Sequence, residues 1–170
     1  VAHNYVDNGG SGIASIFGTL SVEFIPQNGL IIGESSITTD EYEAVQPVAF
    51  DTIIIEAPGP GKIELRLNGN LDVNYGDMIL VAITETKAWD FTDPDNIALE
   101  STNPNEHYVG FSITKVVDIP AAGTYTFYAM AQRGYKEEGN GYIYAYTNLH
   151  ARFYPESSEH VIAAKKIVKN

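Results

Sequence analysis

The chain contains 170 residues, of which 22 are acidic and 10 are Lys or Arg, so its formal net charge is -12 at pH 7. A chain of this length is long enough to form one domain with a sizeable core. Its acidity argues against partners that carry phosphate groups, such as nucleic acid and anionic membrane surfaces. The absence of cysteine excludes disulfides and thiolate chemistry, and no apolar run approaches the roughly 18 to 20 residues needed for membrane insertion.

Two features favour an exported protein. The sequence begins with Val1 rather than Met, as a processed precursor would. It also contains no Asn-x-Ser/Thr triplet, which argues against eukaryotic N-glycosylation. We therefore expect a secreted or cell-surface protein of a prokaryote.

Apolar residues alternate with polar ones along several segments that are separated by turn-forming residues, which is typical of an all-β protein. The predicted strands cover, in chain order, residues 16–24, 48–55, 63–69, 76–84, 108–120, 123–132 and 142–155. Asn-Gly pairs at Asn8, Asn28, Asn68 and Asn140 are expected in tight hairpin turns. This pattern predicts a jelly-roll sandwich of two antiparallel sheets, with about eight strands.

The same pattern indicates one folded domain over residues 13–156. The polar, Gly-rich segment 1–12 is predicted to be a flexible N-terminal arm. Residues 157–170 form a C-terminal extension that fits either a short helix or an edge strand. Residues 136–141, "KEEGNG", are expected to join the last two strands as a hairpin.

One motif carries a resemblance to a known family. In "IPAAGTYTFYAMAQ", Pro120, Gly123, Tyr125 and Phe127 fit a Pro-x-x-Gly-x-Tyr-x-Phe corner, and the last strand ends in the aromatic sequence "LHARFYP". Residues 46–155 thus resemble the globular heads of the complement and tumour-necrosis-factor jelly-roll superfamily. The chain differs from such heads because it continues to residue 170 and shows no preceding collagen-like Gly-x-y repeat. The resemblance implies a jelly roll of eight or ten strands and self-association, usually as trimers.

No sequence motif indicates catalysis. The chain contains neither Gly-x-Ser-x-Gly nor His-Glu-x-x-His. His107, next to Glu106, is the only histidine in a plausible site, and isolated histidines are rarely general bases. We therefore predict that the protein is not an enzyme.

The segment "WDFTDPDN" is the best candidate for a small ligand. Asp90, Asp93 and Asp95 offer oxygen ligands suited to calcium, although the segment lacks the glycine and distal glutamate of an EF-hand. A solvated acidic loop is the alternative, and no other cofactor is predicted. Trp89 and Phe91 are candidates for stacking on a sugar. The alternative for Trp89 is that it fills the open end of the sandwich.

The segment "YIYAYTNLHARFYP" has tyrosines at positions where a solvent-exposed strand face is expected, which suggests an interaction surface. Its odd-numbered apolar residues suffice for a core, so its tyrosines face away from it. Together with side chains expected across the hairpin, they predict one exposed surface, formed by Tyr128, Met130, Tyr142, Tyr144, Tyr146 and Tyr154. Large apolar patches are uncommon on monomers, and Tyr and Met are enriched in interfaces. Coverage by the same chain and a ligand platform are the alternatives to a contact between subunits.

These features together predict a non-enzymatic protein that works by assembly. We expect a self-assembling subunit of a cell-surface filament or appendage, packed through the tyrosines and linked by strand addition from the terminal arms. Residues 12–22 and 160–168 are candidate donor strands. Its partners would be copies of itself. The alternative is a trimeric head that binds a receptor or carbohydrate, like an adhesin or lectin.

Overall fold

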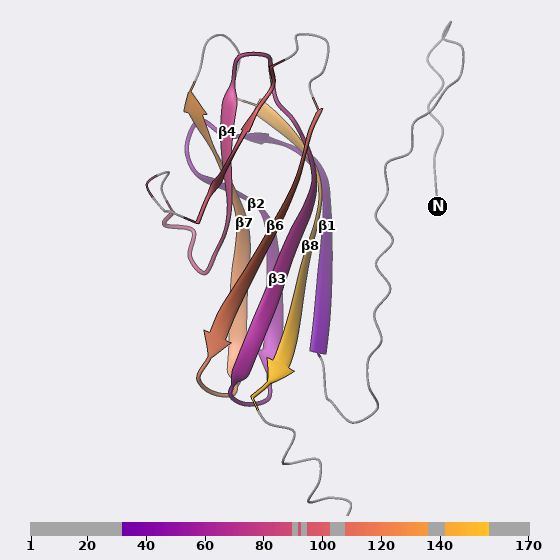
Figure 1. Cartoon of the computed structure of the whole chain (residues 1–170), viewed down its shortest axis with the longest axis vertical. Coiled ribbons are helices and arrows are strands. Elements are labelled where there is room, and N and C mark those ends of the chain that lie inside the picture. Colours follow the sequence, from indigo (N-terminus) through magenta and orange to yellow (C-terminus); the bar gives the residue numbers. More distant parts are fainter. Residues whose placement is uncertain (1–31, 90–91, 93–94, 103–107, 136–141, 157–170) are drawn as a thin grey trace, which may run out of the picture.

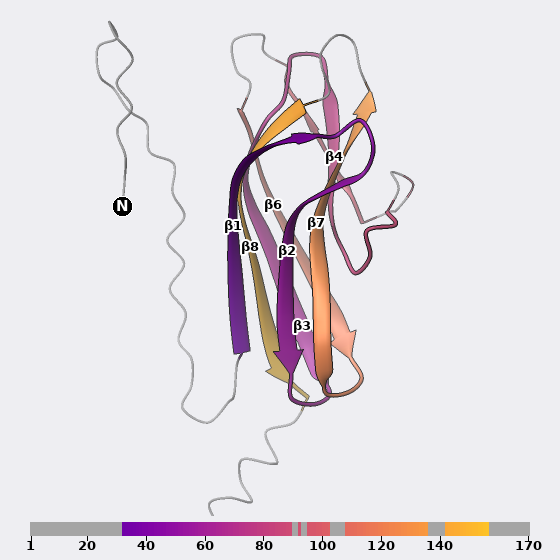
Figure 2. The same cartoon turned by 180° about the vertical axis from the view of Figure 1, so that it is seen from behind.

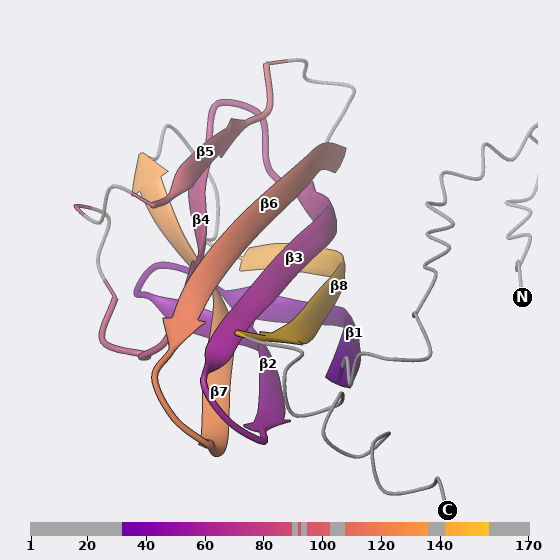
Figure 3. The ribbon, with the colours of Figure 1, turned by 60° about the horizontal axis from the view of Figure 1, so that its bottom comes forward.

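The computed structural model of the chain describes residues 32–89, 92, 95–102, 108–135 and 142–156. These residues form two four-stranded antiparallel sheets that pack face to face (Figure 1, Figure 3). Their strands are β1 (Ile32–Glu43), β2 (Val48–Ala57), β3 (Gly61–Asp72), β4 (Met78–Thr84), β5 (Ile97–Glu100), β6 (Tyr108–Ile119), β7 (Gly123–Tyr135) and β8 (Tyr142–Pro155). The described part of the chain holds no helix with the length and apolar character required to cross a membrane.

The strands pair as in a long hairpin that has been wrapped into a sandwich. β1 pairs with β8, β2 with β7, β3 with β6, and β4 with β5. The first sheet has the order β1-β8-β3-β6 and the second sheet has the order β2-β7-β4-β5. Figure 2 shows the chain leaving β1, crossing the end of the sandwich and returning as β2. This connectivity is that of a jelly roll, so the predicted fold class is confirmed.

The sequence predicted most of the described strands. The prediction for β8 matches its bounds, and those for β2, β3, β4, β6 and β7 overlap the observed strands. β1 and β5 were not predicted, because β1 is mostly polar and β5 has only 4 residues. The predicted strand 16–24 and both terminal arms lie outside the described residues.

One expected turn is wrong. Asn68 and Gly69 lie within β3, not in a hairpin turn. A Cβ atom on Gly69 would collide with the carbonyl oxygen of Tyr146 and would lie 2.7 Å from Cα of Thr147. Glycine therefore serves here to let β3 approach β8 closely.

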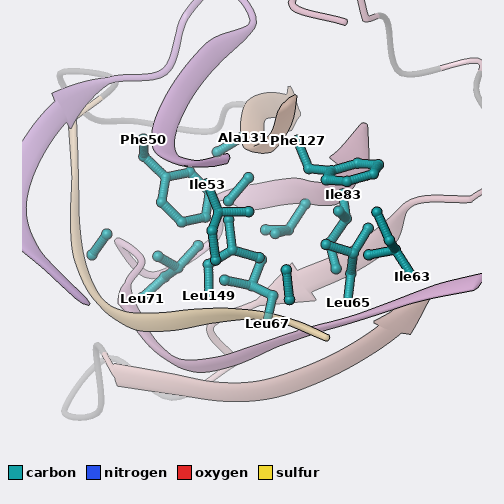
Figure 4. Packing of buried hydrophobic residues seen from close by; sticks show 14 of the residues in the cluster. Phe50, Ile53, Ile63, Leu65, Leu67, Leu71, Ile83, Phe127, Ala131 and Leu149 are labelled. Atoms are coloured by element: carbon teal, nitrogen blue, oxygen red, sulfur yellow. The ribbon is translucent and has the colours of Figure 1, made fainter. Parts of the chain in front are cut away.

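The core lies between the two sheets, where large apolar side chains from both layers meet (Figure 4). Leu65, Leu67 and Leu149 from the first sheet are 0 % exposed, and Phe127 from the second is 1 % exposed. Each such side chain contributes roughly 1.5 to 3 kcal/mol by leaving water. The odd-numbered positions of β8 from 143 to 153 are all buried, as predicted.

Polar contacts close the two long sides of the sandwich. On one side, Ser36 Oγ donates to Asp51 Oδ1 at 2.7 Å and Thr38 Oγ1 donates to the Phe50 carbonyl at 3.2 Å. On the other side, Lys115 Nζ in β6 donates to the Ile83 carbonyl in β4 at 3.1 Å. Lys115, which interrupts an apolar row in the sequence, therefore links the two sheets.

Candidate interaction surface

The outer face of the first sheet is built around β8. Residues that pair across neighbouring strands point to the same face, so strand register places their side chains in rows. Tyr144 lies between Glu41 of β1 and Asp72 of β3, and Asp72 pairs in turn with Tyr108 of β6. Tyr142 pairs with Glu43.

Four tyrosines on this surface are exposed, and we call Tyr108, Tyr142, Tyr144 and Tyr146 the tyrosine face. Tyr142, Tyr144 and Tyr146 are 42 %, 43 % and 44 % exposed, and Tyr108 is 60 % exposed. The rings of Tyr108 and Tyr146 meet edge to face with centroids 5.8 Å apart. Gly110, which pairs with Asn70, has no side chain to separate them.

Two of the tyrosine hydroxyls on this face, those of Tyr108 and Tyr144, have raised pKa values. Tyr144 Oη donates to Glu41 Oε2 at 2.8 Å, and this bond to a carboxylate raises the pKa of Tyr144. The pKa of Tyr108 is raised mainly by burial and then by the nearby Tyr146. The face presents aromatic rings and their hydroxyl groups beside the carboxylates of Glu41, Glu43 and Asp72.

The other end of the same surface is rich in cations. Lys62 pairs with Asp118, and Arg66 pairs with Glu64. The bond to Asp118 raises the pKa of Lys62. Arg152, on β8, is paired in register with Glu64 of β3.

A neutral polar row separates the two ends. Asn148 Nδ2 donates to Ser35 Oγ at 2.9 Å and to the Ser36 carbonyl at 3.2 Å. Ser112 Oγ donates to Asn68 Oδ1 at 2.6 Å. These bonds use the polar groups within the sheet itself.

The predicted surface is wrong in part, because β7 and β8 belong to different sheets. The hairpin expected across residues 136–141 would have paired these strands, but β7 pairs with β2 and β4. Met130 is 1 % exposed, and Tyr128 packs beside it on the second sheet. Tyr154 does lie on β8, but beyond Asn148 and Arg152, at the cation-rich end.

A loop covers the outer face of the second sheet. Trp89, which follows β4, is 5 % exposed and packs with Leu80, Ala82 and Met130. The ammonium group of Lys87 lies 5.3 Å from the ring centre of Tyr128. The buried indole leaves no open ring face for a sugar, and it covers the sheet face, not the open end of the sandwich. Phe91 lies outside the described residues.

The acidic segment 89–96 is only partly described. Asp95 Oδ2 accepts a hydrogen bond from Lys115 Nζ at 3.1 Å. Asp90, Asp93 and His107 lie outside the described residues, so calcium binding stays a prediction. Within the described ranges, no three His, Cys, Asp or Glu side chains are grouped closely enough to hold a metal ion.

Sequence reasoning missed two groups of residues. Asp77 and Arg133 form an ion pair with side chains only 4 % and 5 % exposed, although charged residues near strand ends are normally solvated. Glu41 of β1 accepts a hydrogen bond from the tyrosine face, and Tyr108 of β6 belongs to that face because β3 pairs with both β6 and β8. The alternation of β6 was a usable signal for Tyr108, whereas the polar sequence of β1 gave none for Glu41.

The solved structures that resemble the chain include distant neighbours from a bacteriophage and a virus. No family model and no curated protein matches the chain. The tripod (BppUct-A-L) from the baseplate of bacteriophage Tuc2009 matches with a TM-score of 0.46 and 13% identity, over 92% of this chain and 84% of that chain. The VP2 subviral particle of infectious bursal disease virus matches with a TM-score of 0.45 and 10% identity, over 84% of this chain and 39% of that chain. At these scores the likeness carries no functional information.

Proposed function

We propose that the chain is a non-catalytic structural subunit that associates with copies of itself through the tyrosine face. The observation that carries this proposal is the exposure of Tyr108, Tyr142, Tyr144 and Tyr146 on a sheet whose inner side already fills the core. Tyrosine suits an interface because it offers a large rigid contact area at a small entropic cost. In this proposal the subunit belongs to an extracellular filament or appendage.

The contrast with the second sheet supports an external partner. On that sheet, the outward apolar residues Leu80, Ala82 and Met130 are covered by Trp89 of the same chain. Within the described part of the chain, no segment covers the tyrosine face in the same way. A second subunit would remove these rings from water, which is the main driving force for association.

Sedimentation velocity over a range of concentrations tests the proposal. We expect the full chain to associate as its concentration rises, and Tyr142→Ser, Tyr144→Ser and Tyr146→Ser combined to shift it to monomer. Ile54→Ser is the matched control, because Ile54 is 55 % exposed on the second sheet. A wild-type chain that stays monomeric up to its solubility limit would contradict the proposal.

The terminal arms have a separate role in this proposal, namely linking subunits by strand addition. Deletion of residues 1–12 should leave a folded protein that forms only small oligomers. Light scattering and circular dichroism measure the two properties. Large assemblies formed by the shortened chain would remove the arm from the mechanism while leaving the tyrosine face in it.

One observation favours a second function, carbohydrate binding by a receptor-binding head. Asn70 pairs in register with Tyr146, and Asp72 pairs with Tyr144, so an amide and a carboxylate flank exposed rings. Rings of this kind stack on sugars while the polar groups bind hydroxyls. Binding to a glycan array that Tyr146→Ala abolishes, by a protein that stays monomeric, would favour this function.

A further inference from the structure

The first sheet has two edge strands, β1 and β6, and they differ in how well their inward side chains are covered (Figure 3). On β1, Ser36 and Thr38 bond to the second sheet and close that side of the sandwich. The inward apolar residues of β6 pack against the core but are only partly buried, namely Val109, Phe111, Ile113 and Val117. On the facing edge of the second sheet, β5 has only 4 residues. The core is therefore incompletely covered beside β6.

The backbone of β6 also has an open edge. This strand pairs with β3 on one side and with no other described strand on its second side. An open edge binds a further strand through main-chain hydrogen bonds, and the added strand must continue both the inner apolar row and the outer row. It must also accommodate Lys115, the one charged residue of the inner row, whose Nζ reaches the Ile83 carbonyl at 3.1 Å.

We infer that residues 14–25 of a second copy of the chain add to this edge as an antiparallel strand, with Gly18 opposite Lys115. The inference rests on the strand addition in the proposed function and names its donor and its acceptor. In this register the inward residues Ile16, Leu20, Val22 and Phe24 of the donor lie opposite Val117, Ile113, Phe111 and Val109. Apolar side chains thus meet along the inner row, and the only glycine of the donor lies beside the lysine.

The outer row matches in the same register. Phe17 lies opposite Val116, which is 58 % exposed, and Ile25 lies opposite Tyr108, which is 60 % exposed. The polar pairs on this side are Thr19 with Thr114 and Ser21 with Ser112. Aromatic rings beside β-branched residues, and pairs of hydroxyl side chains, are combinations that stabilise neighbouring antiparallel strands. Both faces of the donor therefore suit the same alignment.

Other alignments match less well. A shift by two residues in either direction sets Lys115 opposite Ile16 or Leu20. A parallel pairing that keeps the glycine opposite this lysine carries the end of the donor beyond the end of β6. The antiparallel alignment uses all 12 residues of β6, and Pro26 and Pro120 follow the two strands. Proline has no backbone donor for a ladder, so both strands end where the alignment ends.

The donor comes from another copy because its own linker is too short. Antiparallel pairing places Ile25 beside Tyr108, at the start of β6. Ile32, where β1 begins, lies level with Val117, since strand pairing joins these two residues through β8 and β3. The nine residues from Tyr108 to Val117 rise about 30 Å, and the width of the sheet adds to this distance. The seven residues from Ile25 to Ile32 span at most about 25 Å when fully extended.

Cysteine pairing between full-length chains tests the register, because the chain has no cysteine of its own. A mixture of Thr19→Cys and Thr114→Cys should form a disulfide-linked dimer on mild oxidation, as non-reducing electrophoresis would show. Thr19→Cys with Asp118→Cys is the matched control, because Asp118 is exposed on the same side of β6 but four residues away, beyond the reach of a disulfide. Equal crosslinking in the control, or none in the first mixture where the wild type associates, would overturn the inference.

Two substitutions of neighbouring donor residues test the effect on assembly. Leu20→Asp places a carboxylate in the inner apolar row and should weaken self-association on the order of 100-fold. Ser21→Asp adds the same charge on the outer side and should associate as the wild type does. Sedimentation velocity measures both, and urea denaturation in dilute solution should give both variants the wild-type free energy of unfolding. A lower value for Leu20→Asp alone would show that the segment packs within its own subunit and would overturn the inference.

The outcomes separate this inference from the proposed function. Association that Leu20→Asp leaves unchanged, but that the combined variant of Tyr142, Tyr144 and Tyr146 abolishes, would overturn the inference alone. A wild-type chain that stays monomeric would overturn both. The donor lies outside residues 1–12, so the chain shortened by these residues tests the arm and not this pairing.

Discussion

The outer faces of the two sheets follow the same alternation of inward and outward residues, yet among the described residues only the second sheet has outward apolar side chains buried under a loop. On the second sheet, Leu80, Ala82 and Met130 point outward and Trp89 packs over them. On the first sheet, the outward positions of β8 hold tyrosines that are 42 to 44 % exposed. The difference lies in the chemistry of the outward side chains.

Leucine and methionine have no group that can bind water, so an outward row of them requires a cover. Tyrosine has a hydroxyl that binds water or a carboxylate, as Tyr144 does with Glu41. It can therefore remain exposed in a free subunit and still bury a large ring when a partner arrives. A tyrosine row thus suits a surface that is covered only after assembly.

The largest effect expected from this comparison is on stability. Trp89→Ala should lower the free energy of unfolding by about 3 kcal/mol, because it removes the cover of the second sheet and leaves a cavity. Tyr144→Ala should lower the free energy by less than about 1 kcal/mol in the monomer, since its ring is only half buried. Urea denaturation at low protein concentration measures both values. Equal losses would mean that both outer faces belong to the folded core.

Sequence reasoning succeeded where the signal was local. Alternation of apolar residues predicted the bounds of β8 and the burial of Ile143 and Phe153. It failed where the position of a strand depended on pairing with strands that are distant in the sequence. A short turn between two strands usually joins neighbours in one sheet, but the jelly roll sends β7 and β8 to opposite sheets. Tyr128 and Met130 were therefore assigned to the wrong surface.

The sequence predicted only those residues of the tyrosine face that share one strand. Tyr142, Tyr144 and Tyr146 share one strand, so their common face follows from period-two alternation. Tyr108 reaches Tyr146 only because β3 pairs with both β6 and β8. Such a contact requires the register of three strands, which a single sequence does not contain.

A smaller effect should distinguish the inner and outer sides of the first sheet. Gly69→Ala adds a methyl group that meets the backbone of Tyr146 and Thr147, so we expect a loss of about 2 kcal/mol in unfolding free energy. Gly110→Ala is the matched variant. Its Cβ would lie 3.1 Å from Asn70 Oδ1, an atom at the end of a side chain that can move. We expect a loss below about 0.5 kcal/mol there, and the reverse order in thermal melts would refute this account of the packing.

The smallest expected effect concerns a single proton on the tyrosine face. The hydrogen bond to Glu41 raises the pKa of Tyr144 above its ordinary value of 10.0. Glu41→Gln removes the negative charge of the acceptor and should lower that pKa, as an NMR titration of 13C-labelled tyrosine would measure. Glu100→Gln, an exposed change on the second sheet, should leave it unchanged.

The raised pKa also fixes the direction of the pH dependence. A group whose pKa is higher in the folded state contributes stability that is fully present below its unfolded pKa and is lost as the pH rises through the folded value. The difference in stability between the wild type and Glu41→Gln should therefore be constant from about pH 6 to about pH 10, where the carboxylate is ionised and the phenol is protonated, and be lost as the pH rises through the folded pKa of Tyr144. A Tyr144 pKa that is identical in the two proteins would show that the carboxylate does not hold this hydroxyl in solution. The tyrosine face would then differ from the covered face of the second sheet in exposure alone.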